Sequence, residues 1–368
     1  MSTKIYSRNL LALFFLVSLC GISFGGPWYD TALPGIQVMD MHIFKSQLWV
    51  ASYGKGIFQY DMKKKTWKNY STQNQNAEDD FFHCIAVSDE YIWAGTSEGL
   101  YIYDRKKETW KKRKFVAGGE YGNWIRALYY DVDENVLWVG RFQYLTRLDV
   151  SKQKYEDINL QVGNDDRSNN VKSIHGDGEN FVWIGTESGA FRYDKRTNPS
   201  DRTSYENFSN KESSFRGEGD FVSVADIFAD EDAVWFATEE FVTIDKPRFN
   251  LGGLFKYNRK ATWTKYDRST GLPGNGVKAI AKTGNRLWLG VYSFEKAEKN
   301  EIGQGLVMLN TSTGKAQNIR LDDIKAESNL IHALLFDGDS LWIGTEKGLY
   351  RITFSNPFAV FTQKKKTK

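Results

Sequence analysis

Short runs of alternating apolar and polar residues cover most of the chain, and the runs recur with nearly the same composition. Each repeat contains a variant of Leu-Trp-Ile-Gly-Thr followed by Gly-Leu-x-x-Tyr-Asp, and successive tryptophans lie 44 to 54 residues apart. A period of this size indicates a repeat architecture, and four strand-like runs per period are typical of one propeller blade. The pattern predicts an all-β, seven-bladed β-propeller with four antiparallel strands per blade. The seven tryptophans are Trp49, Trp93, Trp138, Trp183, Trp235, Trp288 and Trp342.

The sixth repeat shows how four strands fit into one period. Alternation predicts strands over residues 277–281, 286–291, 306–310 and 316–319, with Gly and Asn at the turns between them. The same spacing places the first blade at residues 36–70 and the last at 331–362. A short Asp or Asn side chain begins the last hairpin and is expected to accept hydrogen bonds from the turn backbone. It recurs as Asp61, Asp104, Asp149, Asp194, Asn258 and Asn310.

The repeated tryptophan is expected to pack between neighbouring blades. Two positions after it, every repeat has Gly or Ala, and side chains two apart in a strand share one face. A small residue at that point allows the next sheet to approach closely. The tryptophans are therefore assigned to the core, with a row that stacks on sugars as the alternative.

The overall composition agrees with a single folded domain and is too low in hydrophobic residues for a multi-span membrane protein. The chain has 368 residues, of which 41% are hydrophobic and 6 are proline, and its net charge is +3. Two cations near the start and four lysines in the tail account for more than this charge, so the body is slightly acidic. Such a body has no global basic field, and we expect no nucleic-acid partner. The basic residues 363–368 are interpreted as a solvated tail.

The first 25 residues resemble a secretory signal peptide. Lys4 and Arg8 precede an apolar run that is too short to span a membrane, and small residues follow it. We expect cleavage before Gly26, a propeller over residues 26–362, no membrane span in the mature chain, and a periplasmic or secreted location. A lipid anchor on Cys20 is the less favoured alternative, because a bulky leucine precedes it. Cleavage before Gly26 would leave Cys84 as the only cysteine of the mature chain, and its apolar neighbours predict a buried thiol.

The repeats resemble those of the two-component regulator propeller family. The resemblance rests on Leu341-Trp342-Ile343-Gly344-Thr345, with the following Gly348-Leu349-Tyr350, and on Gly271-Leu272-Pro273-Gly274-Asn275-Gly276-Val277. It covers about residues 33–362. In that family the propellers form the exported sensor halves of hybrid histidine kinases, which implies recognition of extracytoplasmic ligands, often glycans. This chain shows one ring of seven repeats and no kinase, so the resemblance does not imply phosphotransfer.

The first strand of each blade carries a candidate binding signal. The residue after the leading apolar position is Met39, His83, Arg126, Lys172, Ser223, Lys278 and His332 in the seven repeats. Five of these are cationic or histidine, and inward-pointing side chains would form a positive ring at the channel mouth. An anionic glycan would suit such a ring. The alternative is that these residues are exposed or paired with Glu98, Glu187 and Glu346.

Two second-to-third connections are unusually long, at residues 238–253 and 292–305. They belong to neighbouring blades and leave the same face, and long loops on a rigid scaffold often bind ligands. We expect them to form one wall of a site. Their candidate ligand-binding side chains are Phe241, Arg248, Tyr292 and Phe294.

Support for catalysis is thin. The chain has four histidines, and none has the spacing of a metal-ligand pair; no nucleophile elbow or phosphate-binding loop is present. We therefore assign no catalytic residue, metal or cofactor. The favoured function is an exported module that binds a small molecule, a glycan or an envelope protein. The alternative is a propeller lyase or hydrolase, with His83 and His332 as acid and base at the channel mouth.

Overall fold

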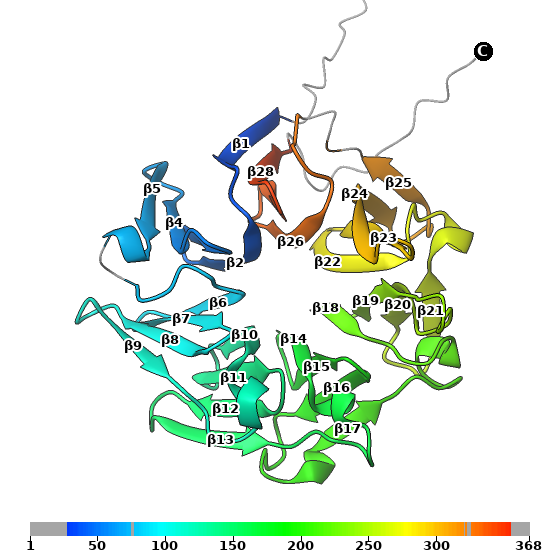
Figure 1. The fold of residues 1–368 in the computed structure, drawn as a ribbon, viewed down its shortest axis with the longest axis horizontal. Helices are drawn as coiled ribbons and strands as arrows, with labels where there is room; N and C mark the ends of the chain where they lie inside the picture. Colours follow the sequence, from blue (N-terminus) through cyan, green and yellow to red (C-terminus); the bar gives the residue numbers. More distant parts are fainter. Residues whose placement is uncertain (1–27, 75–76, 320, 322–324, 355–368) are drawn as a thin grey trace, which may run out of the picture.

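The protein is a seven-bladed β-propeller, as the repeat pattern predicts (Figure 1). The computed structural model describes residues 28–74, 77–319, 321 and 325–354. Seven four-stranded antiparallel sheets surround a central axis, and the first strand of each repeat lies innermost. The predicted leader at residues 1–25, which includes Cys20, and the predicted tail at residues 363–368 both lie outside the described residues.

The strands follow the repeats in order. Blade 1 consists of β2 (Val38–Phe44), β3 (Gln47–Ser52), β4 (Ile57–Asp61) and β5 (Thr66–Tyr70), and blade 2 of β6 (Cys84–Val87), β7 (Tyr91–Thr96), β8 (Gly99–Asp104) and β9 (Thr109–Arg113). Blade 3 consists of β10 (Ile125–Asp131), β11 (Val136–Arg141), β12 (Leu145–Asp149) and β13 (Lys154–Ile158), and blade 4 of β14 (Val171–Gly176), β15 (Phe181–Thr186), β16 (Gly189–Asp194) and β17 (Tyr205–Phe208). Blades 5 and 6 consist of β18 (Val224–Ala229), β19 (Val234–Phe241), β20 (Asn250–Tyr257) and β21 (Trp263–Tyr266); and β22 (Gly276–Thr283), β23 (Arg286–Glu295), β24 (Asn300–Asn310) and β25 (Ala316–Ile319). Short 3-10 turns η1 to η6 occupy Thr72–Asn74, Gly119–Asn123, Asp166–Asn169, Arg202–Ser204, Phe215–Gly217 and Arg268–Thr270.

Blade 7 is closed by both ends of the chain, which corrects the predicted boundaries. Its three inner strands are β26 (Ile331–Phe336), β27 (Ser340–Thr345) and β28 (Gly348–Thr353). The outer strand is β1 (Trp28–Pro34), which pairs antiparallel with β28. The prediction that blade 7 lies wholly within residues 331–362 was wrong, because the fourth strand comes from before the first repeat. This pairing joins the two ends of the ring without a covalent bond.

Each repeated tryptophan lies between two blades, as predicted. All seven are at most 1% exposed. Trp183 of blade 4, for example, belongs to the same apolar cluster as Val224 and Phe236 of blade 5. The small residue two positions on is needed for this contact: a Cβ at Gly140 would lie 2.6 Å from Val171 of the next blade, and one at Gly344 would lie 2.4 Å from Val38. In the five blades with glycine at this position, the leading apolar residue of the next blade's first strand occupies the space above that glycine.

The turn chemistry also follows the prediction. Asp61 Oδ1 accepts hydrogen bonds from the backbone N–H groups of Lys63 and Lys64, at 3.0 and 2.9 Å. In the next five blades the equivalent Asp or Asn also accepts at least one hydrogen bond from a backbone N–H of its turn. Cys84 is buried, and burial raises the pKa of its thiol, so it is a core side chain and not a reactive nucleophile.

Candidate functional site

A β-bulge in the first strand aims the predicted ring residues at the channel mouth. In blade 3 the register with the second strand skips one residue between Ile125 and Ala127, so Arg126 has no partner in the ladder. Five other blades skip at the same point, and in blade 2 the strand begins directly after His83. A bulge turns the extra side chain out of the sheet. The repeated bulge therefore explains why these positions meet at one end of the channel.

The mouth cavity has a volume of about 240 Å³, and all five predicted cationic or histidine residues line it. Blade 5 departs from the prediction: the skipped residue is Ala225, between Val224 and Asp226, and Ser223 lies two positions earlier. The misassignment arose because Val222 was taken as the leading apolar residue in place of Val224. The lining residues are Met39, His83, Trp124, Arg126, Lys172, Ala225, Glu239, Lys278 and His332.

Carboxylates pair with the three cations of the ring. Arg126 lies 2.7 Å from Glu187, and Lys278 lies 2.6 Å from Glu301. Lys172 forms an ion pair with Glu239, which also accepts a hydrogen bond from the Ser223 hydroxyl. Of the carboxylates considered in the sequence, only Glu187 pairs with the ring, since Glu98 contacts Lys112 and Glu346 contacts Ser328.

The two histidines of the ring are uncharged at neutral pH. Burial lowers the pKa of His332 to about 4, and Lys278 nearby lowers it further in the same direction. Burial also lowers the pKa of His83. With the cations paired and the histidines neutral, the expectation of a positively charged ring was wrong. The mouth is a polar surface with little net charge.

Replacing Glu239 with glutamine tests the buried ion pair. Burial alone raises the pKa of Glu239, but attraction to Lys172 and its hydrogen bonds outweigh burial and lower the pKa to about 2. The carboxylate is therefore expected to stabilise the fold above pH 4.5, and this contribution disappears as the pH falls toward 2; burial lowers the pKa of its partner Lys172, which offsets part of the gain. Glu239→Gln should lose that stability at pH 7, measured by urea unfolding. A variant as stable as the parent at pH 7 would contradict the prediction.

The two long connections are extended β-hairpins, which corrects the expectation of irregular loops. In blade 6, Phe294 pairs with Glu301 and Glu295 with Asn300, so β23 and β24 continue beyond the sheet of the other blades. In blade 5, the pairing of β19 with β20 continues to Phe241 and Asn250.

The four predicted side chains of these segments have different environments. Phe241 is 40% exposed, and its ring lies 4.8 Å from that of Phe294. Tyr292 is 1% exposed and donates a hydrogen bond to the Glu240 carbonyl, but it also lines a cavity together with Phe241 and Phe249, so its role as a ligand contact stays a prediction. A Cβ at position 276 would lie 2.2 Å from the Tyr292 ring, so this ring packs directly against the backbone of Gly276. Arg248 is exposed near the hairpin end and does not line the mouth cavity.

Glu240 holds the two hairpins together. It is 8% exposed, and its carboxylate accepts hydrogen bonds from Asn275 Nδ2 and from the Phe294 N–H, both at 2.9 Å. Asn275 in turn accepts a hydrogen bond from the Arg268 N–H, at 3.1 Å. These bonds fix the position of Phe241 relative to Phe294.

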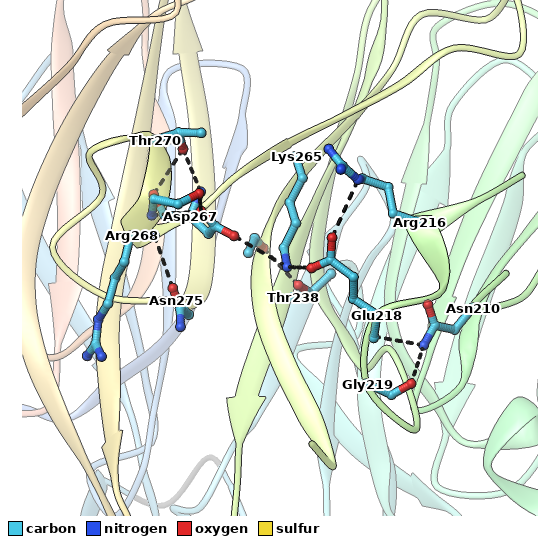
Figure 2. Close-up of polar contacts among 12 residues, drawn as sticks. Asn210, Arg216, Glu218, Gly219, Thr238, Lys265, Asp267, Arg268, Thr270 and Asn275 are labelled. Carbon is cyan, nitrogen blue, oxygen red and sulfur yellow. Dashed lines mark hydrogen bonds and ion pairs between the residues drawn. The ribbon is translucent and has the colours of Figure 1, made fainter. Parts of the chain in front are cut away.

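A polar network on the outer side supports the same region (Figure 2). Lys265 of β21 is buried and contacts Glu218 at 2.6 Å and Asp267 at 3.4 Å. Asn210 donates hydrogen bonds to the carbonyls of Glu218 and Gly219. The connection that leads into blade 5 is therefore anchored to the outer strand of that blade.

Aromatic rings on blades 4 to 6 form a continuous group that we name arc B. Phe221 contacts Phe249, Phe249 contacts Phe241, and Phe241 contacts Phe294, with ring centroids 4.8 to 5.5 Å apart. The Arg167 guanidinium lies over the rings of Phe221 and Phe249, at 3.8 and 4.9 Å. A second cavity of about 400 Å³ lies beside arc B, and Arg167, Phe241 and Phe249 line it.

A second aromatic group, arc A, lies over blades 1 to 3 and was missed in the sequence. Ring contacts of 4.9 to 6.1 Å link its successive members. The available signal was Trp124, a tryptophan outside the repeated position and directly before a ring residue. Arc A consists of Phe81, Tyr53, His83, Trp124, Phe142 and Tyr121.

Below the ring, the channel is a cavity of about 490 Å³ that contains two carboxylates. Asp40 accepts hydrogen bonds from the N–H groups of Met41 and Ile85, and Asp226 from those of Ile227 and Ile280. Each thus links its own blade to the next. Burial raises the pKa of Asp40 to about 6 and that of Asp226 to about 7.

Within the described ranges, His, Cys, Asp and Glu side chains nowhere gather in a group of three suited to a metal ion. Over the same residues, the structure contains no helix with the length and apolar character needed to cross a membrane.

Comparison with known proteins supports the fold. No family model and no curated protein matches the chain. Two solved structures of the extracellular domain of BT4673 from B. thetaiotaomicron, titled as a putative one-component and a putative hybrid two-component system, align with a TM-score of 0.65 and 21% and 20% identity. The alignments cover 88% of this chain and 39% of that domain, so the chain spans about two fifths of its length.

Two smaller propellers are also similar. Virginiamycin B lyase from Staphylococcus aureus aligns with a TM-score of 0.62 and 12% identity, over 89% of this chain and all of that one. YCF48 bound to D1 peptide aligns with a TM-score of 0.62 and 12% identity, over 92% and 98%. At these identities the likeness concerns the fold alone, and the class defined so far is a seven-bladed β-propeller.

Proposed function

We propose that this chain is an exported binding module that recognises a glycan on its upper face. The upper face is the end of the propeller that carries the second-to-third loops, the connections between blades and the channel mouth. The observation that supports the proposal is the mouth itself, where paired ionic groups lie between two arcs of aromatic rings. Aromatic faces stack on the C–H faces of sugars, and fixed polar groups beside them bond hydroxyls and set orientation.

Export is part of this proposal. It is supported by the signal-like residues 1–25 and by similarity to an extracellular domain. The mature chain would act in the periplasm or outside the cell. The anionic preference expected from the sequence loses its support, because Glu187, Glu239 and Glu301 neutralise the cations of the ring.

Docking of an envelope protein is a second candidate, and one observation favours it. Among the described residues, eight of the nine exposed large apolar side chains lie on upper-face connections, and only Val132 lies on an opposite turn. Concentrated apolar exposure on one face marks interaction surfaces. The eight are Tyr53, Phe81, Val116, Tyr121, Val162, Phe241, Ile244 and Ile302.

A thermal-shift screen of the mature protein against neutral and acidic oligosaccharides tests the glycan proposal. A ligand at 100 times its Kd stabilises the fold by about 2.7 kcal/mol, which gives a clear rise in unfolding temperature. Trp124→Ala should remove most of this rise, measured against the variant's own ligand-free midpoint, because the Trp124 ring lines the mouth cavity and stacks on Phe142. Val132→Ala, on the opposite face, is the matched control. A screen without any stabilising glycan would overturn the proposal and leave protein docking.

A further inference from the structure

Arc A forms an exposed track that leads away from the channel mouth. His83 and Trp124 line the mouth cavity, while Phe81, Tyr53 and Tyr121 are 49%, 45% and 54% exposed. Since the ring contacts are continuous, a ligand at the mouth can extend over arc A without leaving aromatic surface. Large, half-exposed aromatic rings are poorly solvated in the free protein, and a group of such rings on one face marks a binding surface.

The continuity of the rings suits a ligand longer than one sugar unit. Arc A consists of six rings, each within the ordinary aromatic contact distance of the next, at 4.9 to 6.1 Å between centroids. Trp124 and Phe142 are stacked with an angle of 6° between their planes, which gives one rigid platform beside the mouth. Rigid aromatic side chains lose little conformational entropy on binding.

The charges around the track disfavour an acidic ligand. Arg126 lies over the rings of Trp124 and Phe142 but is already paired with Glu187. Lys172 and Lys278 are likewise paired, and His83 and His332 are neutral for the reasons given above. The buried carboxylate of Glu240 has hydrogen-bond partners but forms no ion pair among the described side chains. An anionic sugar would have to displace one of these carboxylates, which a hydroxyl-bearing neutral sugar need not do.

From these observations we infer that the ligand is an uncharged oligosaccharide of several units, which starts at the mouth and extends along arc A. This inference rests on the proposed function and deepens it. The Trp124–Phe142 platform holds one unit beside the mouth, and Tyr53 and Phe81 hold units farther out. Neutral His83 and the paired ionic groups bond the hydroxyls.

The test is a printed array of neutral and acidic glycans of one to six units, followed by calorimetric titration of the best-bound series. The affinity of the parent protein for the neutral series should rise more than tenfold from one to four units. Phe81→Ala and Tyr53→Ala should each remove most of that gain and leave the affinity for the single unit unchanged. Both rings are nearly half exposed, so the unfolding midpoints should stay at the parent value. Val132→Ala is the control.

Each outcome decides between the two proposals. Preference for an acidic series, or affinity that does not rise with length, would overturn this inference while glycan binding itself stands. Length dependence that survives in Phe81→Ala and Tyr53→Ala would place the chain of sugars away from arc A and overturn it as well. No binding to any glycan would remove the proposed function and this inference together.

Discussion

Trp183→Ala should lower the free energy of unfolding by about 4 kcal/mol, within the range for deleting a buried aromatic side chain. Trp183 has no exposed surface and contacts the rings of Phe208, Phe236 and Tyr257, with centroids 5.6 to 6.0 Å apart. Two of these partners belong to blade 5. The cavity would therefore open between two blades, where neither sheet can close it without losing its other contacts.

Urea unfolding followed by tryptophan fluorescence and circular dichroism measures this effect. Trp124→Ala is the matched control, because Trp124 is half-buried on the upper face and is not part of the buried apolar clusters that pack the sheets of blades 1 to 3 together. Trp124→Ala should lower the free energy of unfolding clearly less than Trp183→Ala does. If the two variants are equally stable, the repeated tryptophan is not a main source of cohesion between blades.

Removal of β1 should clearly lower the free energy of unfolding or make the protein aggregate. Blade 7 would retain three strands, and the outer edge of β28 would expose unpaired N–H and C=O groups. Leu33, which is buried in the cluster shared by blades 7 and 1, would also be lost. The ring would then be held at its junction by the contacts of the inner strands alone.

Complementation in trans distinguishes closure from general damage. A synthetic peptide covering residues 26–36 should restore the unfolding midpoint of the shortened protein, because it supplies the missing ladder and Leu33. The same peptide with Thr31→Pro should restore less, since proline cannot donate to a ladder. A shortened protein as stable as the parent would show that β1 does not close the ring.

Most of the fold could be predicted from the repeats because their period is local. In blades 1 to 4 the turn Asp follows the tryptophan by 11 or 12 residues, and in blades 5 and 6 the turn Asn follows it by 23 and 22 residues because of the long connections. The pattern within one repeat therefore determines its sheet. The ring positions could also be found, since every blade places them directly after the same apolar residue. Blade 5 was misread by two positions because Val222 and Val224 are equally apolar.

The charge of the mouth could not be predicted from those positions. Arg126 and Glu187 are 61 residues apart, and Lys172 and Ser223 are 51 apart. Their contacts depend on where the connections of one blade lie relative to the next blade. The pattern within a single repeat does not determine that placement. The same reason applies to arc A, whose rings come from three blades and lie outside the repeated motif.

The sequence by itself determined the number of blades, the core tryptophans, the close blade contacts and the turns, because these depend on spacing within one repeat. Only the tertiary structure decided that β1 closes blade 7, that carboxylates neutralise the ring, that Tyr292 is buried, and that two aromatic arcs border the mouth. These features join residues from different blades. Their energies come from burial and pairing across the ring, which exist only once the ring has closed.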